Sequence, residues 1–407
     1  MQRKQYIADY EIISLIAEGS YSRIFKAKHT VLQCFVALKV YSKENLQNPQ
    51  IQQHFNTEVE HLSEAKHPFI VELFDVIENE KCYALVLEYI ETGSLLDQVN
   101  SPDKLTEVEI KRLYCQIVMA LTYLHEELKI VHCDLKLENI LLDRHRNIRL
   151  IDFGFSSRVV DGSPQLTKAN GSPAYVAPEI LKGYKYGSPV DIWASGIVLY
   201  SLLNNQLPFQ GSTPQEQLQQ VMNNELYLPD TLSLFEKELL KHLLNKNDLF
   251  RITLSELRNY PLIESTYSEL NGKILKYIKW YQRPDKDVFS MMQDIGYPTI
   301  GILATLVGNT PKNKTSAVYS ILHRAKLLDL LGGIKVTHHS SKEKLVLKIP
   351  KYQKTIMCQT GSVKIENKMI NDAHQQHLSK TTVPTRKAPQ RRHSFASTKK
   401  FTNSTFA

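Results

Sequence analysis

The chain has 407 residues, of which 42% are hydrophobic and 23% are charged, so it can bury a large core and still leave room for a second module. The formal net charge of +8 comes from the C-terminal end, because residues 338–407 carry 14 Lys+Arg and 3 Asp+Glu, whereas the other 337 residues carry 36 Lys+Arg and 39 Asp+Glu. The main part of the chain is therefore not basic, and its charge does not indicate a nucleic-acid-binding core. No apolar run is near the roughly 18 residues that a membrane helix needs, and none follows the first five residues, which argues against a membrane span and a signal peptide.

The first predicted element is a strand, turn and strand at 16–24, with the sequence IAEGSYSRI. Glycines in such a turn let backbone amides approach phosphates closely. Phosphate-binding turns of this type usually carry three glycines, but here only Gly19 is present, with Ala17 and Ser22 in the other two places. We therefore expect a stiffer turn and weaker nucleotide binding.

A buried strand and a helix follow. Residues 36–39 (VALK) read as a strand that ends in Lys39, whose ammonium is suited to hold the inner phosphates of a nucleotide. Glu58 lies in a helical pattern that leads to the His-Pro pair at 67–68, and it is the candidate carboxylate partner of that lysine. Glu60 is the less favoured alternative.

Residues 130–139, IVHCDLKLEN, are the most informative stretch. Phosphoryl transfer asks a protein mainly to position the reacting groups and to neutralise charge. Asp134 is suited to accept or orient the proton of an acceptor hydroxyl, Lys136 to neutralise the transferring phosphoryl, and Asn139 to offer an amide oxygen to a divalent ion. Each residue alone would most often be a solvated loop residue, so the interpretation depends on the whole run.

Two shorter motifs follow in the chain. The run 150–154 (LIDFG) ends an apolar strand with Asp152, which is suited to chelate magnesium, and with Gly154, which lets the backbone turn. An Ala-Pro-Glu motif ends in Glu179, which we expect to form a buried ion pair with Arg251.

These motifs, in this order and spacing, resemble the signature of eukaryotic protein kinases over about residues 10–262. Lys136 is similar to the catalytic-loop lysine of serine/threonine kinases. The sequence from residues 67–70 to 207–209 resembles that of the calcium/calmodulin-dependent group, especially its AMP-activated-like (SNF1-like) branch. The resemblance implies an α+β, two-lobed fold, with a β-rich N-lobe to about residue 90, a mainly helical C-lobe, and ATP between them. It also implies that Asp191 braces the catalytic loop.

The implied activity is transfer of the γ-phosphoryl of Mg-ATP to Ser/Thr hydroxyls of protein substrates, with ATP and Mg²⁺ as cofactors. The implied residues are, for catalysis, Asp134, Lys136, Asn139, Lys39 and Glu58; for the metal, Asn139 and Asp152; for ATP, Ile16, Ala17, Gly19, Ser20, Ser22, Ile24, Ala37, Lys39, Glu88, Ile90 and Leu141; for substrate docking, Glu138, Ser172 and Pro173; and, as a structural pair, Glu179 and Arg251.

A pseudokinase or scaffold, whose basic tail binds partners or anionic surfaces, is the alternative. The intact set of metal and base residues disfavours it, because a chain released from catalysis would more often have lost one of them. A kinase of small molecules is disfavoured by residues 171–179, which resemble a peptide-docking segment.

Two departures from the family pattern concern regulation. Cys133 stands where most kinases carry an arginine that pairs with a phosphorylated activation segment. Lys168 stands where this branch has its regulatory threonine, with Thr167 adjacent. We predict that activity does not depend on activation-segment phosphorylation and that Lys168 forms a fixed ion pair instead. A redox role for Cys133 is disfavoured, since a buried cysteine is usually inert.

Substrate preference is partly legible. Glu138 matches an acidic position that faces arginines before the acceptor in basophilic kinases, so we predict a basophilic enzyme. Ser94, however, replaces the hinge-side acidic residue that such kinases use and that also contacts ribose, with Asp97 or Glu91 as candidates to compensate.

The sequence after residue 262 predicts a helical region followed by a tail. We expect a linker helix at 263–286 and a three-helix ubiquitin-associated-like module at 287–332, with a plain helical extension as the alternative. In this branch such a module commonly packs on the kinase, so 287–332 is also the candidate contact for a regulatory partner. Residues 333–407 predict a basic, largely disordered tail with at most one short strand at 344–349.

The tail and the cysteines suggest further contacts and a compartment. Ser394 follows two arginines and is a candidate autophosphorylation site, with a solvated charge run as the alternative. The tail is also a candidate for weak contact with anionic lipid or nucleic acid. Five scattered cysteines without Cys-x-x-Cys spacing argue for a reducing interior and against a zinc site or disulfides, so we expect a cytoplasmic protein, with the nucleus open.

Overall fold

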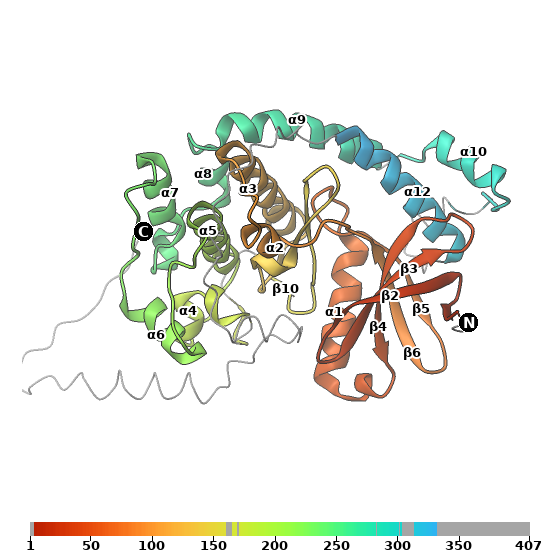
Figure 1. Ribbon diagram of the computed structural model, residues 1–407, viewed down its shortest axis with the longest axis horizontal. Coiled ribbons are helices and arrows are strands. Elements are labelled where there is room, and N and C mark those ends of the chain that lie inside the picture. Colours follow the sequence, from red (N-terminus) through yellow and green to blue (C-terminus); the bar gives the residue numbers. More distant parts are fainter. Residues whose placement is uncertain are drawn as a thin grey trace, which may run out of the picture.

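A computed structural model describes residues 4–159, 165–168, 171–281, 283–300, 302 and 313–331 (Figure 1). The predicted strand at 344–349, the tail at 333–407 and Ser394 lie outside the described residues.

The N-lobe is an antiparallel sheet with the strand order β1-β2-β3-β4-β6-β5, and one long helix, α1, lies beside it (Figure 1). The elements are β1 (Tyr6–Ile7), β2 (Tyr10–Glu18), β3 (Ser22–His29), β4 (Phe35–Ser42), η1 (Asn45–Gln47), α1 (Pro49–Glu64), β5 (Leu73–Glu78) and β6 (Cys82–Glu88).

Local sequence explains where α1 begins and which face it buries. The Asn48 side chain accepts a hydrogen bond from the Gln50 amide, and Pro49 occupies the first helical position, where its missing N–H is not needed. Apolar residues at helical spacing, among them Phe55 and Leu62, are buried in the main core. Glu58 shares this buried side, which directs its carboxylate toward the sheet.

The C-lobe is mainly helical. Its elements are α2 (Leu95–Val99), α3 (Glu107–Thr122), η2 (Tyr123–Glu127), β7 (Ile130–Val131), η3 (Leu137–Asn139), β8 (Ile140–Leu142), β9 (Ile148–Leu150), β10 (Ser157–Arg158), η4 (Pro173–Tyr175), α4 (Pro178–Leu181), α5 (Pro189–Asn204), α6 (Pro214–Asn223), α7 (Leu234–Leu243), η5 (Asp248–Phe250) and α8 (Leu254–Arg258).

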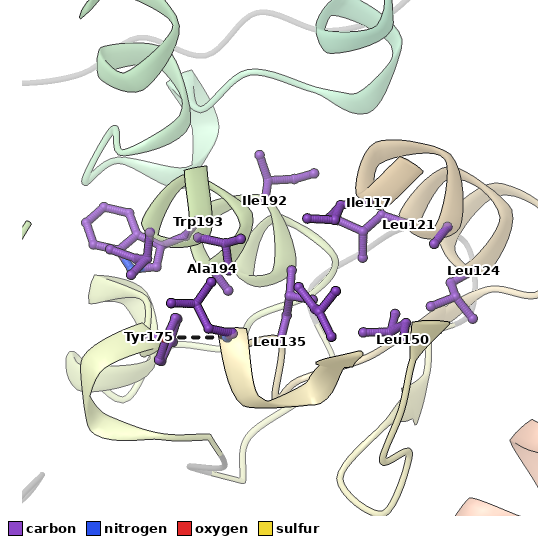
Figure 2. Packing of buried hydrophobic residues seen from close by; sticks show 14 of the residues in the cluster. Ile117, Leu121, Leu124, Leu135, Leu150, Tyr175, Ile192, Trp193 and Ala194 are labelled. Carbon is purple, nitrogen blue, oxygen red and sulfur yellow. Dashed lines mark hydrogen bonds between the residues drawn. The ribbon is translucent and has the colours of Figure 1, made fainter. Parts of the chain in front are cut away.

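Helix α5 forms the centre of this lobe, because it is apolar on nearly every side. Gly196 lets it approach α7 closely: a Cβ at this position would lie 2.9 Å from the Leu243 Cβ. Figure 2 shows Leu135, from the catalytic loop, among buried side chains of α3 and α5. The loop is therefore anchored in the helical core, and the predicted two-lobed α+β fold is confirmed.

The described residues beyond the C-lobe include three helices: α9 (Glu264–Tyr281), α10 (Lys286–Asp294) and α12 (Lys314–Leu331). Helix α9 packs on α3, and α12 contacts α9, α10 and strand β5 of the N-lobe (Figure 1). Val288, Met292, Ile302 and Val318 form a small separate core between α10 and α12. These helices occupy the region of the expected linker and module, and the ubiquitin-associated-like assignment stays a prediction. In the described part of the chain, no helix is long and apolar enough to cross a membrane.

Candidate active site

The catalytic loop is fixed from below by Asp191, in the first turn of α5. Its carboxylate accepts hydrogen bonds from the backbone N–H groups of His132 (2.7 Å) and Cys133 (2.9 Å), and His125 Nε2 lies 2.7 Å from Oδ2. Burial opposes the charge of Asp191, but the contacts with the two histidines outweigh burial and lower its pKa. A buried, charged acceptor thus holds the backbone of the loop immediately before Asp134.

Asp134 is the centre of a polar group. Its Oδ2 accepts hydrogen bonds from Lys136 Nζ (2.8 Å) and Asn139 Nδ2 (3.1 Å), and its Oδ1 accepts one from Ser172 Oγ (3.1 Å). Burial alone would lower the pKa of Lys136, but Asp134 and Glu138 raise it, so the ammonium stays charged. The group therefore combines a carboxylate base, a cation and a hydroxyl in one network.

Lys39, on β4, connects three parts of the site. Its Nζ donates to both carboxylate oxygens of Glu58 (2.6 and 2.8 Å) and to Asp152 Oδ1 (3.1 Å). Burial opposes the charge of Lys39, but the two acids raise its pKa well above the ordinary value. Burial raises the pKa of Glu58, and the attraction of Lys39 offsets this only in part. Glu60, the alternative partner, is exposed and lies 3.5 Å from Arg158.

Asp152 and Asn139 have the chemistry of magnesium ligands. Burial works to raise the pKa of Asp152, but the Lys39 and Lys136 charges hold it at about 2, so the carboxylate is ionised. Asn139 donates through Nδ2 to Asp134, and none of the hydrogen bonds among the described residues uses its amide oxygen. Within the described residues no group of three or more His, Cys, Asp or Glu could hold a metal alone. One carboxylate and one amide fit an ion that takes its other ligands from phosphates and water, as Mg²⁺ does.

The residues predicted to contact ATP come from both lobes. In the sheet register Ile24 pairs with Lys39 and Ala37 pairs with Leu87, so Ala37 and Lys39 share one face of β4. The N-lobe also contributes Glu88 at the end of β6 and the half-buried Ile90 after it, and the C-lobe contributes Leu141 on β8. The remaining predicted residues, Ile16, Ala17, Gly19, Ser20 and Ser22, lie on β2, β3 and the turn between them.

The backbone of the glycine-poor turn does not require glycine at Ala17 or Ser22, and its expected stiffness and weaker nucleotide binding stay predictions. Ala17 pairs with Ile24 in the β2–β3 ladder, and neither Ala17 nor Ser22 has a positive φ. The Gly19 N–H donates to Ser22 O at 2.8 Å and closes the turn. A Cβ is therefore tolerated at both positions without strain.

The predicted docking residues lie beside Asp134. Glu138, in η3, is close to Lys136 and Tyr175, and burial raises the pKa of its carboxyl against the pull of Lys136. Glu138 Oε2 is buried and has no hydrogen-bond partner among the described residues. Ser172 contacts Asp134 as described, and Pro173 begins η4.

Ser94 has a structural use. It caps α2: its N–H and hydroxyl donate to Asp97 Oδ2 at 2.8 and 2.7 Å, and its Oγ accepts from the Asp97 N–H. One oxygen of Asp97, a candidate to replace the missing acid, is therefore committed to this cap.

The structural pair of the C-lobe is a two-pronged buried contact. Arg251 Nη1 and Nη2 lie 2.7 and 2.9 Å from the two carboxylate oxygens of Glu179. Both side chains are nearly inaccessible, with 0% and 3% exposure. The pair ties α4 to the segment between η5 and α8.

Of the two regulatory departures, Cys133 lies in the loop before Asp134 and Lys168 lies in the activation segment. Cys133 is buried with a left-handed backbone (φ 65°), and burial, followed by the nearby Asp191 and Asp134 charges, raises the pKa of its thiol well above the ordinary value. The salt bridges among the described residues do not include Lys168, whose Nζ donates to the neutral amide oxygen of Gln53 on α1 at 3.0 Å, and its expected ion pair stays a prediction. The Lys168 carbonyl in turn accepts a hydrogen bond from Tyr186 OH.

Sequence analysis missed two residues of the site. The Tyr41 hydroxyl donates to Glu58 Oε2 at 2.7 Å, and His125 contacts Asp191. Tyr41 follows Lys39 by two residues, so strand periodicity was a usable signal for its face. His125 had no local signal, because it reaches Asp191 across 66 positions of the chain.

Comparisons with known proteins agree with this geometry. The family model described as protein kinase domain matches residues 10–263. The chain is similar to the SNF1-related protein kinase catalytic subunit alpha KIN12 of Arabidopsis thaliana, with 31% identity over 317 residues, which are 78% of this chain and 64% of that protein. It is 37% identical over 253 residues to the carbon catabolite-derepressing protein kinase of Saccharomyces cerevisiae, covering 62% of this chain and 40% of that one. The SNF1-like protein kinase ssp2 of Schizosaccharomyces pombe is 31% identical over 344 residues, covering 84% and 58%. The chain thus spans less than two thirds of the length of these relatives.

Proposed function

The chain belongs to the protein kinase family, and from this we propose that it is a serine/threonine kinase that transfers the γ-phosphoryl of Mg-ATP to Ser/Thr hydroxyls of protein substrates. The observation that carries the proposal is the contact of Asp134 with Lys136, Asn139 and Ser172. A chain that only bound partners would have no use for a charged base, a cation and a metal-binding amide in one network.

Each residue has a physical task in the transfer. Asp134 accepts the hydrogen bond of the acceptor hydroxyl and takes its proton, and Lys136 balances the charge that develops on the transferred group. Lys39, held by Glu58, contacts the inner phosphates. Bound Mg²⁺, held by Asp152 and the Asn139 amide oxygen, would neutralise phosphate charge and orient the phosphoryl group.

We further propose a basophilic substrate preference. The partnerless Glu138 Oε2 supports it, since a buried acceptor without a donor is costly and an arginine of a bound peptide would satisfy it. Burial raises the pKa of Glu138 and the attraction of Lys136 offsets this only in part, so the carboxyl gains from a further cationic partner.

One assay tests the reaction and this preference. The purified full chain with Mg²⁺ and ATP should phosphorylate serine and threonine peptides and not the matched tyrosine peptide. An arginine two or three residues before the acceptor should raise kcat/KM about tenfold over alanine, the size of one charge-assisted hydrogen bond. Absence of turnover on any peptide would favour the scaffold alternative. Equal rates with and without arginine would refute the preference.

We also propose that activity does not require phosphorylation of the activation segment. The contact of Lys168 with Gln53 supports it, because it joins this segment to α1, which carries Glu58, without a phosphate. Thr167→Ala and phosphatase treatment should leave kcat/KM within about twofold. Lys168→Ala should lower it by roughly threefold to tenfold, the net size of one typical hydrogen bond.

The matched control is Lys185→Ala, which removes an exposed lysine elsewhere in the C-lobe and should have no effect. Loss of most activity on phosphatase treatment, reproduced by Thr167→Ala, would contradict the proposal.

Other aspects remain proposals from the sequence. They are a regulatory partner for 287–332, weak contact of the tail with anionic lipid or nucleic acid, and a cytoplasmic or nuclear location.

A further inference from the structure

Arg324 lies on α12, far beyond the region that matches the kinase family model, yet its side chain is buried against the N-lobe. Only 2% of the residue is exposed. Helix α12 contacts β5, and Ile321, one turn before Arg324, is buried in the same cluster as Val36 and Val86 of the sheet. The helix thus brings a cation to the side of the sheet near the end of β6.

The guanidinium is bonded at every nitrogen. Its Nε and Nη2 donate to Glu88 Oε2 at 3.1 and 2.9 Å. Nη1 donates to the carbonyl of His67 (3.1 Å) and to Tyr277 OH, and Nη2 donates to the carbonyls of Pro68 (3.2 Å) and Ile70 (2.8 Å). One side chain therefore holds both the end of β6 and the connection between α1 and β5.

Glu88 has two roles at this place. Its backbone belongs to the segment expected to face adenine, and its N–H donates to Glu72 O at 3.0 Å. Its carboxylate is buried between Arg149 Nε (2.8 Å) and Arg324. Burial opposes the charge of Glu88, but the two guanidiniums outweigh burial and lower its pKa.

Removing Arg324 would leave an unbalanced group of charges. Glu72 is also buried, with its Oε2 3.6 Å from Arg324 Nε and without a hydrogen-bond partner among the described residues. Arg149 is already shared between Glu88 and Asp143. An unpaired buried carboxylate is strongly destabilising, so the end of β6 would have to move to expose one.

We propose that Arg324 is a positioning residue for nucleotide binding: through Glu88 it holds the hinge segment in the shape that receives adenine. The inference rests on the proposed function for the identity of the nucleotide. Because coupling between sites is reciprocal, nucleotide binding also favours docking of α12. The helical extension is accordingly part of the nucleotide site.

The test measures nucleotide binding separately from phosphoryl transfer. The full chain is titrated with a fluorescent ATP analogue in the presence of Mg²⁺, and peptide turnover is measured over a range of ATP concentrations. Arg324→Met, which keeps the volume and removes the charge, should raise Kd and the KM for ATP about tenfold, with a smaller change in kcat. The matched control is Lys326→Met, which removes a lysine charge from the same helix. Lys326 pairs with Asp285 and Asp287, away from Glu88, so its loss should change Kd by less than about twofold.

A second pair of variants tests the route through Glu88. In a Glu88→Gln background, Arg324→Met should raise Kd clearly less than it does in the wild-type chain, because the buried charge of Glu88 is then no longer left without Arg324. Equal costs in both backgrounds, or a wild-type Kd for Arg324→Met, would overturn the inference. If circular dichroism shows that Arg324→Met is unfolded, Arg324→Lys replaces it in the titration. Lysine keeps the positive charge but lacks the several N–H donors of the guanidinium, so weaker nucleotide binding supports the inference and unchanged binding overturns it. A wild-type chain that binds nucleotide without turnover would contradict the proposed function and leave this inference intact.

Discussion

Asp134→Asn is expected to lower kcat for peptide phosphorylation by roughly 10²–10⁴-fold, the size of a lost general base. The amide has nearly the same shape, but it cannot accept the hydroxyl proton, and it removes the negative charge that faces Lys136 at 2.8 Å. The affinity for the fluorescent ATP analogue should stay within about threefold, because Lys39 and Asp152 remain. Steady-state kinetics together with nucleotide titration check both parts.

The matched control for this variant is Asp230→Asn. Asp230 is a fully exposed carboxylate of the C-lobe that lies 3.2 Å from Lys237. Its replacement should leave kcat unchanged, since it contacts nothing in the site. Retention of more than about a tenth of wild-type kcat by Asp134→Asn would contradict the assigned role.

Arg251→Met is expected to lower the free energy of unfolding by about 3–5 kcal/mol, because it leaves Glu179 as a buried, unpaired carboxylate. Arg251 also donates to the carbonyls of Pro189 (2.8 Å) and Asn245 (3.1 Å), so its loss leaves further acceptors without partners. Urea denaturation followed by tryptophan fluorescence is a suitable measurement, since Trp193 lies 5.3 Å from the Arg251 guanidinium.

A double variant and a surface control make this prediction specific. Arg251→Met with Glu179→Leu should be less destabilised than Arg251→Met alone, since no charge is then left buried. Lys237→Met, which removes the exposed pair with Asp230, should change stability by less than about 1 kcal/mol. Equal losses for the exposed and the buried pair would contradict the account.

The catalytic groups could be predicted from the sequence where residues that act together are close in the chain. Asp134, Lys136 and Asn139 lie within six positions, so the turn of the backbone already brings them near one another. Residues 36–39 were likewise expected to form a strand, and the register of β4 with β3 and β6 places Ala37 and Lys39 on one of its faces. The two-lobed fold followed from the order of such motifs.

The regulatory contacts were harder to predict from the sequence, because the type of a single residue does not identify the residue that it will contact. The sequence marked Cys133 and Lys168 as unusual, but it did not reveal the partner that Lys168 has within the described residues, an amide on α1 that lies 115 positions away. The glycine-poor turn was judged from residue types, whereas its backbone is extended at Ala17 and Ser22 and needs no glycine there.

The sequence by itself determined the class of chemistry, because the base, the cation and the metal-binding amide are set by residue type within a short run. Only the tertiary structure decided how the site is held: Lys39 meets Glu58 and Asp152, Asp191 fixes the loop, and Arg324 reaches Glu88 across 236 positions. Such pairs depend on how helices and strands pack, because a buried charge needs a partner and here that partner comes from a distant segment.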